Sequence, residues 1–150
     1  MSDGRTRTLD LITALEARLR TDPVVISEAG GRIKARSTAQ EVVQPGLYWT
    51  ITSSLLGEVF EDVTLMWELW TRDRAGMSAV RGGLLLEDAV RRVMHRDLPV
   101  TLELPDDGEI TVWSQLEVAY DADPADPVWA RKILRFRYQM TRVRPLTPEV

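Results

Sequence analysis

The chain has 150 residues, 44% of them hydrophobic and 28% charged, which bounds it to one globular domain with a sizeable buried core. Its net charge of −4 and isoelectric point near 5.1 argue against a dedicated nucleic-acid-binding protein, which usually carries a basic excess. The absence of cysteine excludes disulfides and thiolate metal sites, and the single histidine, His95, excludes a histidine-cluster metal site within one chain.

Signals for secretion, membrane insertion and catalysis are missing from the sequence. The N-terminal residues contain no apolar run of the kind that a secretory signal needs, and no stretch approaches the roughly 20 apolar residues of a membrane helix. No nucleophile-elbow, phosphate-loop or EF-hand pattern is present. We therefore expect a protein without enzymatic activity, cofactor or membrane contact, kept in the cytoplasm or in a particle assembled there.

The first third of the chain predicts a helix, a short strand and a loop. Apolar residues at helical spacing predict a helix over residues 8–20, with Thr8 as its cap and Asp22-Pro23 as its stop signal. A short strand is expected over residues 32–35. The following segment, residues 36–45, has no helical or strand period, so it indicates a long loop of the kind that is often functional.

Two long strands are expected next, over residues 47–55 and 59–72. Apolar and polar side chains alternate in both, and β-branched and aromatic residues are frequent. The glycine-containing turn between them indicates an antiparallel hairpin. The second strand is expected to be the centre of the domain, because both of its faces carry large apolar side chains: Trp67 on one, and Met66 and Trp70 on the other. One face should meet the helices, and the other should be covered by loops or by a neighbouring subunit.

A second helix is expected over residues 77–95. The Gly82-Gly83 pair costs about 1 kcal/mol per glycine relative to alanine, which places the start of this helix near Leu84. The apolar residues expected to face the sheet are Val80, Leu84, Leu85, Ala89, Val93 and Met94.

The last third predicts three strands. Residues 100–104 and 109–118 indicate a hairpin around a Pro-Asp-Asp-Gly turn, and residues 130–143 indicate a long closing strand. The order is helix, three strands, helix, three strands. It predicts an α+β fold, in which an antiparallel sheet of about four to six strands has two helices packed on one face, in a single domain spanning residues 1–150.

Three groups of side chains permit more than one interpretation. The acidic clusters, the best of which is DADPADP over residues 121–127, suit solvated turns better than a Ca²⁺ or Mg²⁺ site, which needs several convergent oxygens. Trp70 and Met66 suit either a protein interface, where such residues are enriched, or local coverage. The arginine row of the last strand suits either cross-strand pairing with Glu68 or Glu117, or an acidic partner surface or ring lumen.

The layout resembles a family, the tail terminator or tail-completion proteins of long-tailed bacteriophages and related gene-transfer particles. The matching stretches are an opening helix (LITALEARLRTDP), a GGRI turn and strand, an aromatic strand after a proline (PGLYWTIT), a long strand with the pattern VTLMWELW, an amphipathic helix rich in alanine and arginine, and a closing arginine-bearing strand (ILRFRYQMTRV). These stretches run through most of the chain and describe a fold, with no catalytic residue among them.

The resemblance implies a structural virion protein at the head–tail junction. Members look like subunits of a ring, hexameric in this family, that caps the head-proximal end of the tail tube, ends tube polymerisation and joins the tail to the head connector. The implied partners are further copies of the chain, the tail tube protein and the head-closure protein, with DNA only passing through the lumen. The residues expected to form subunit or partner contacts are Arg36, Glu41, Val42, Val43, Met66, Trp70, Arg131, Arg135 and Arg137.

Two alternatives from other classes stay open. The first is another joint protein of the neck or tail, such as a head-closure or tail-tube subunit. The second is a small cytoplasmic binding domain with no role in a particle.

Overall fold

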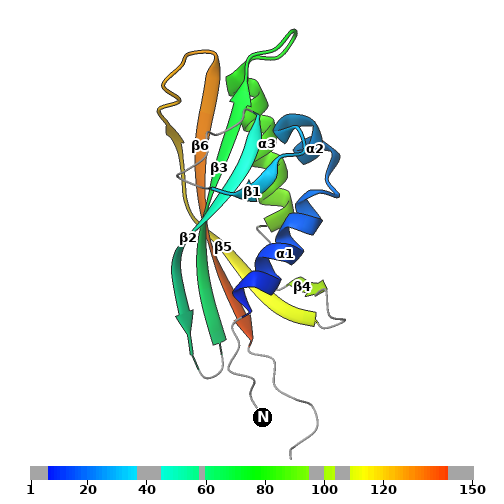
Figure 1. Cartoon of the computed structure of the whole chain (residues 1–150), viewed down its shortest axis with the longest axis vertical. Coiled ribbons are helices and arrows are strands. Elements are labelled where there is room, and N and C mark those ends of the chain that lie inside the picture. The colour runs from blue at the N-terminus through cyan, green and yellow to red at the C-terminus, as the bar shows by residue number, and fades with distance from the viewer. Residues whose placement is uncertain (1–6, 37–44, 58–59, 95–99, 104–108, 142–150) are drawn as a thin grey trace, which may run out of the picture.

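The computed structural model describes residues 7–36, 45–57, 60–94, 100–103 and 109–141. Its elements are α1 (Thr8–Leu19), α2 (Pro23–Ala29), β1 (Ile33–Ala35), β2 (Gly46–Leu56), β3 (Phe60–Arg72), α3 (Ala79–Met94), β4 (Val100–Glu103), β5 (Glu109–Ala122) and β6 (Trp129–Thr141). The six strands form one twisted sheet in the order β1-β2-β3-β6-β5-β4, and the helices lie together on one side of it (Figure 1). The α+β class is therefore confirmed.

Two details of the predicted architecture are corrected. The described residues contain three helices where two were expected, and β1 runs parallel to β2, whereas every other neighbouring pair is antiparallel. The parallel pair covers only Ile33–Ala35 against Leu47–Trp49. A strand of three residues carries too little side-chain pattern to reveal its direction, so nothing local in the sequence distinguishes the two arrangements.

The unexpected helix, α2, begins at the Asp22-Pro23 pair, which was interpreted only as the stop signal of α1. The Asp22 carboxylate accepts hydrogen bonds from the backbone N–H groups of Val24 and Val25, Pro23 occupies the first helical position, and Gly30 closes the helix at φ 62°. An acidic cap, a proline in the first turn and a left-handed glycine are start and stop signals of a helix in their own right. The helix is only seven residues long, too short to show a clear apolar period.

Helix α3 begins at Ala79, five residues before the predicted start near Leu84. The Ser78 hydroxyl accepts a hydrogen bond from the Arg81 N–H and so caps the first turn. Gly82 and Gly83 are buried inside the helix, where an added Cβ would lie 3.2 Å from the Glu28 carboxylate and 3.3 Å from the Thr71 hydroxyl, respectively. The glycines therefore mark a close approach between elements, which offsets their low helix propensity.

The same glycines explain why the buried face of α3 was predicted incorrectly in part. The buried residues of α3 include Leu86, Ala89, Val90 and Met94, and Val93 packs partly buried against the core, so the expectation was right for Ala89, Val93 and Met94. It was wrong for three residues that are exposed: Val80, Leu84 and Leu85. A glycine adds nothing to an apolar pattern, so a helix face that packs through glycine is hidden from a periodicity argument.

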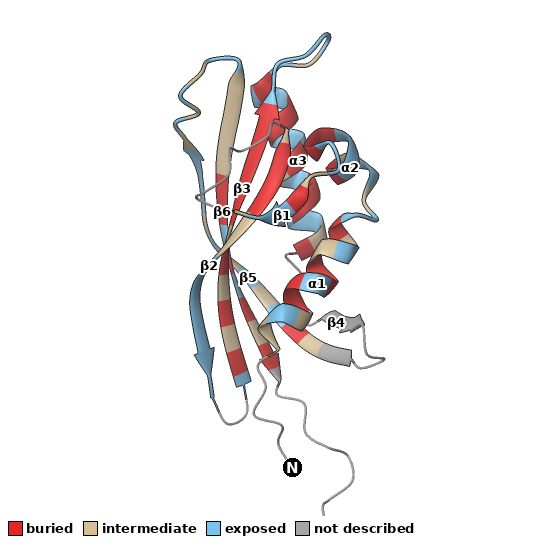
Figure 2. Ribbon diagram, in the orientation of Figure 1, coloured by how far each residue is buried: buried red, intermediate tan, exposed pale blue. Residues whose placement is uncertain are grey.

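The main core lies between the helices and the sheet (Figure 2). Its largest fully buried side chain is Trp67 of β3, and the Trp67 Nε1–H donates a 3.0 Å hydrogen bond to the Tyr138 hydroxyl of β6. Leu134 and Phe136 of β6 pack in the same cluster. As strand parity predicts, Trp67 belongs to this core, whereas Trp70 is absent from the cluster.

Candidate assembly surface

The sheet face opposite the helices, called here the open face, carries the charged and aromatic residues that the sequence singled out. Register places Met66, Glu68 and Trp70 of β3 on this face. They lie beside Arg135, Ile133 and Arg131 of β6, respectively. The open face is the only side of the sheet on which both a tryptophan and a row of arginines meet in the described part of the chain.

Glu68 is the centre of a buried charged cluster on the open face. Its side chain is 3% exposed, and the carboxylate accepts hydrogen bonds from Arg36 Nε at 3.2 Å, Arg131 Nε at 3.0 Å and Trp70 Nε1 at 3.2 Å. A second nitrogen of the Arg131 guanidinium lies 2.9 Å from the same carboxylate. A buried carboxylate needs such partners, because an unpaired buried charge costs several kcal/mol.

Trp70 is covered within its own chain. The Arg131 guanidinium lies 5.3 Å from the centre of the Trp70 ring, and the Trp129 ring packs edge-on against it at 6.1 Å. These two neighbours leave Trp70 8% exposed. Of the two interpretations of Trp70, local coverage therefore describes the isolated chain, and an interface role for this residue stays a prediction.

The other two arginines of the row also pair across strands. Arg135 Nε lies 3.4 Å from Glu117 of β5, and a guanidinium nitrogen of Arg137 lies 3.2 Å from Asp62 of β3. Both arginine side chains are almost half exposed, so each pair contributes about 1 kcal/mol or less to stability. The row is thus compatible with cross-strand pairing and still presents charge to solvent.

The remaining predicted interface residues fall in two places. Met66 is half-buried, between Thr50 of β2 and Arg135 of β6. Glu41, Val42 and Val43, and with them most of the expected loop, lie outside the described residues.

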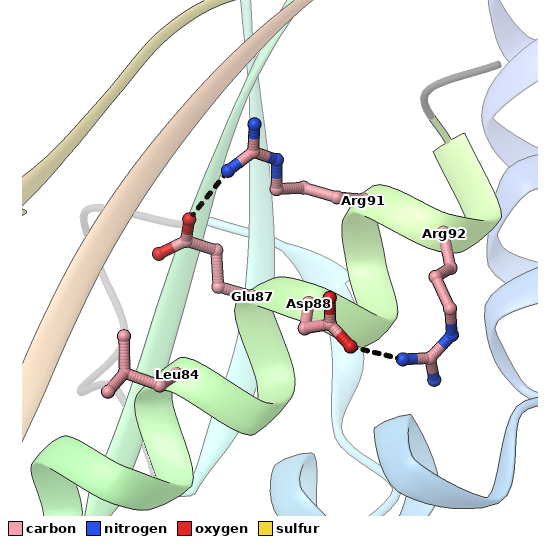
Figure 3. Close-up of a pocket in the computed structure, with 5 residues that line it drawn as sticks. All are labelled: Leu84, Glu87, Asp88, Arg91 and Arg92. Atoms are coloured by element: carbon pink, nitrogen blue, oxygen red, sulfur yellow. Dashed lines mark hydrogen bonds and ion pairs between the residues drawn. The ribbon is translucent and has the colours of Figure 1, made fainter.

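The acidic segment after β5 and the acidic residues of α3 form turns and ion pairs. In the loop after β5, Asp123 and Asp126 accept hydrogen bonds from the backbone N–H groups two residues further on. On the outer face of α3, Leu84 lies in a shallow pocket with the ion pairs Glu87–Arg91 and Asp88–Arg92 (Figure 3). No group of three potential metal ligands converges among the residues that the structure describes.

The pKa values of Tyr138 and Lys132 are both raised, for different structural reasons. Burial raises the pKa of Tyr138, and the hydrogen bond from Trp67 only partly opposes it, so the hydroxyl stays neutral at physiological pH. Desolvation lowers the pKa of Lys132, but hydrogen bonds and charge attraction from Asp121 and Glu87 outweigh it, and the net pKa is raised. Both pKa values therefore lie well above 7, whereas a general acid or base works best with a pKa near the operating pH.

A further feature was missed by the sequence reasoning, namely the exposed outer stretch of β2. Residues 51–57 are all exposed, and they include Ile51, Leu55 and Leu56. Phe60 of β3 and Trp113 of β5 are also partly exposed, and their rings pack edge-on with centres 6.1 Å apart. The available signal was composition, since the seven residues from Thr50 to Leu56 contain no charge and no proline.

The arrangement defines a two-layer α+β domain in which helices cover one sheet face and charged and aromatic side chains occupy the other. The chain is similar in fold to a chain from the virion of a native gene transfer agent particle, with a TM-score of 0.60, 17% sequence identity, and coverage of 92% of this chain and 99% of that chain. No protein-family model matches the sequence, and no curated protein does so either. No helix in the described ranges is long and apolar enough to cross a membrane.

Proposed function

We propose that this protein is a non-enzymatic structural subunit of a phage-like particle, and specifically its tail terminator. In this role, copies of the chain form a ring, hexameric by the family resemblance, on the head-proximal end of the tail tube. The ring stops tube polymerisation and offers its other side to the head-closure protein of the connector.

One observation carries the proposal: the fold similarity to a virion chain extends over almost the whole length of both chains. The sequence resemblance to tail terminators, made from strand and helix patterns, points to the same kind of particle independently. The open face adds a physical argument, because its charged groups are engaged in pairing and burial. Such a surface suits contacts between proteins better than chemistry on a small molecule.

Deletion of the gene in a strain that produces the particle tests the proposal. The lysate is imaged by negative-stain electron microscopy, with and without complementation by the wild-type gene. A terminator predicts tail tubes of uncontrolled length and separate heads, both corrected by complementation.

The other candidate roles give different images. Loss of a tube subunit would remove tubes altogether, and loss of a head-closure protein would leave tubes of normal length beside tailless heads. Normal particles in the deletion strain would reject any essential role in the particle.

A further inference from the structure

The outer half of β2 is an unpaired sheet edge. Strand β1 covers β2 only at Leu47–Trp49, yet β2 continues to Leu56, and no segment in the described part of the chain pairs with that remainder on its outer side. The residues Ile51 and Leu55 of this stretch are 44% and 65% exposed. In Figure 2 this stretch is the pale-blue lower part of β2, away from the helices.

The backbone of this edge points outward in a form that another strand can use. The Leu47 N–H donates to the Arg32 carbonyl, and the Trp49 carbonyl accepts from the Arg36 N–H, so both groups point toward the chain on either side of β1. Because alternate residues of a strand present their backbone groups to the same side, the N–H and C=O of Ile51 also point away from β3. Protein edges are usually protected by charge, proline or bulges, and this stretch has only a single bulge near Thr52.

The sheet has a second open edge, on β5, at the end of the strand order away from β2. Strand β4 covers β5 only at Glu109–Val112, and no described segment pairs with the outer side of the rest of β5. The two open edges lie at the same level, since the register runs from Ser53 through β3 and β6 to Gln115. Strands β2 and β5 also run in opposite directions, because three antiparallel steps separate them.

We propose that the bare edge of β2 pairs with the outer edge of β5 in a second copy of this chain, so that the sheet continues antiparallel from copy to copy. This inference rests on the proposed function, which requires a ring, and it names the ring's contact. A head-to-tail contact between two different edges repeats and closes into a ring when the rotation allows. If the ring axis runs along the strands, neighbouring copies lie at the same height, so Ser53 of β2 in one copy comes opposite Gln115 of β5 in the next. The two strands then run antiparallel, because β2 and β5 point in opposite directions within each copy.

The charges at the two edges are complementary. At the β1 end of the first edge lie two cations: Lys34, which is exposed, and Arg36, which binds Glu68. At the same end of the second edge lie two exposed carboxylates, those of Asp121, which also pairs with Lys132 of its own chain, and Asp123. Like charges would have opposed the contact, whereas this arrangement favours a neighbouring copy in the stated orientation.

A cysteine pair tests the contact directly, because the wild-type chain contains no cysteine. Ser53→Cys and Gln115→Cys are introduced together, and particles or rings carrying this variant are purified and then oxidised. Within one copy the two positions are three strand spacings apart, about 14 Å, which is too far for a disulfide. Replacing Gln115→Cys by Trp113→Cys or Val118→Cys covers a shift of register in either direction.

The expected result is a ladder of covalent oligomers on a non-reducing gel for at least one pair, which dithiothreitol collapses to the monomer. Each single variant is the matched control and should give dimers at most. Assemblies that contain the chain but give no ladder with any pair would overturn the edge contact and leave the terminator role intact. Absence of the wild-type chain from the particle would instead reject the proposed function.

A charge substitution provides a second test. Ile51→Lys places an ammonium group on the bare edge and should reduce incorporation into particles at least tenfold, while the circular dichroism spectrum and unfolding midpoint stay close to wild type. Val80→Lys, at an equally apolar position that is 64% exposed on α3, is the control and should assemble normally. Equal incorporation of both variants would contradict the proposal.

Discussion

The Glu61 carboxylate of β3 caps helix α1 from 54 residues away, accepting the backbone N–H of Arg7 at 2.8 Å. The same carboxylate accepts a hydrogen bond from the Thr8 hydroxyl at 2.8 Å. Thr8 was expected to cap the helix, but it is the first helical residue, and Glu61 provides the cap instead. Glu61 is 1% exposed, and its charge lies at the positive end of the helix dipole. This contact fixes the first turn of α1 to the sheet and plays the part of the glutamate in a capping box.

Replacing Glu61→Gln should lower the free energy of unfolding by about 1–3 kcal/mol, because a buried charged acceptor of backbone and hydroxyl hydrogen bonds is lost. The effect is measured as the shift of the urea unfolding midpoint. Asp88→Asn, in an exposed ion pair on α3, is the control and should change the free energy of unfolding by less than about 1 kcal/mol. Equal small shifts would show that the cap contributes little.

The two central tryptophans should respond differently to truncation. Trp67→Ala should cost about 3–5 kcal/mol, because it leaves a cavity between helices and sheet and removes a partner of Tyr138. Trp70→Ala should cost clearly less in the isolated chain, because Trp70 lies outside the core between helices and sheet and packs on the open face against Arg131 and Trp129. Calorimetric unfolding of both variants is the measurement, and equal large losses would contradict this ranking.

Glu68→Gln should destabilise the chain by about 1–3 kcal/mol, because two partly buried guanidinium groups lose their shared counter-charge. Glu117→Gln makes the same chemical change on the same face in an exposed pair and should cost about 1 kcal/mol or less. Urea unfolding of the two variants in parallel checks the difference. If the glutamine at position 68 were harmless, the cluster would serve no stabilising purpose.

Alkaline pH should destabilise the fold through Tyr138. In the unfolded chain a tyrosine ionises near pH 10, whereas burial raises the pKa of Tyr138 in the folded state. The stabilising contribution is therefore complete below about pH 10 and is lost as the pH rises further, by about 1.4 kcal/mol per unit.

A comparison with Tyr138→Phe isolates this effect. The variant should be less stable at pH 8 by about 1 kcal/mol, because Trp67 loses its acceptor, and this deficit should shrink above pH 10. Urea unfolding between pH 8 and 11 is the measurement, with Tyr120→Phe, a 52% exposed position, as the control. A deficit that stayed constant with pH would exclude Tyr138 as the source.

Local pattern predicted most of the strands of this protein, although it missed the parallel direction of β1 and the last four residues of β5, which was expected to end at residue 118. The alternation in β3 and β6 predicted both their extent and the opposite faces of Trp67 and Trp70, because side chains of a strand alternate regardless of what surrounds it. It also predicted the pairing of β2 with β3 and of β4 with β5, since a short polar turn between two such strands leaves few other topologies.

The tertiary structure alone decided which distant groups meet. Glu61 reaches α1 across 54 residues, and Glu68 joins Arg36 and Arg131 across 32 and 63 residues, contacts that no spacing rule announces. The buried face of α3 passes through Gly82, whose role depends on the neighbouring Glu28 rather than on its own side chain. Likewise, whether an edge is paired depends on how far its neighbours extend, so the bare stretch of β2 became visible only once β1 was seen to stop at Ala35.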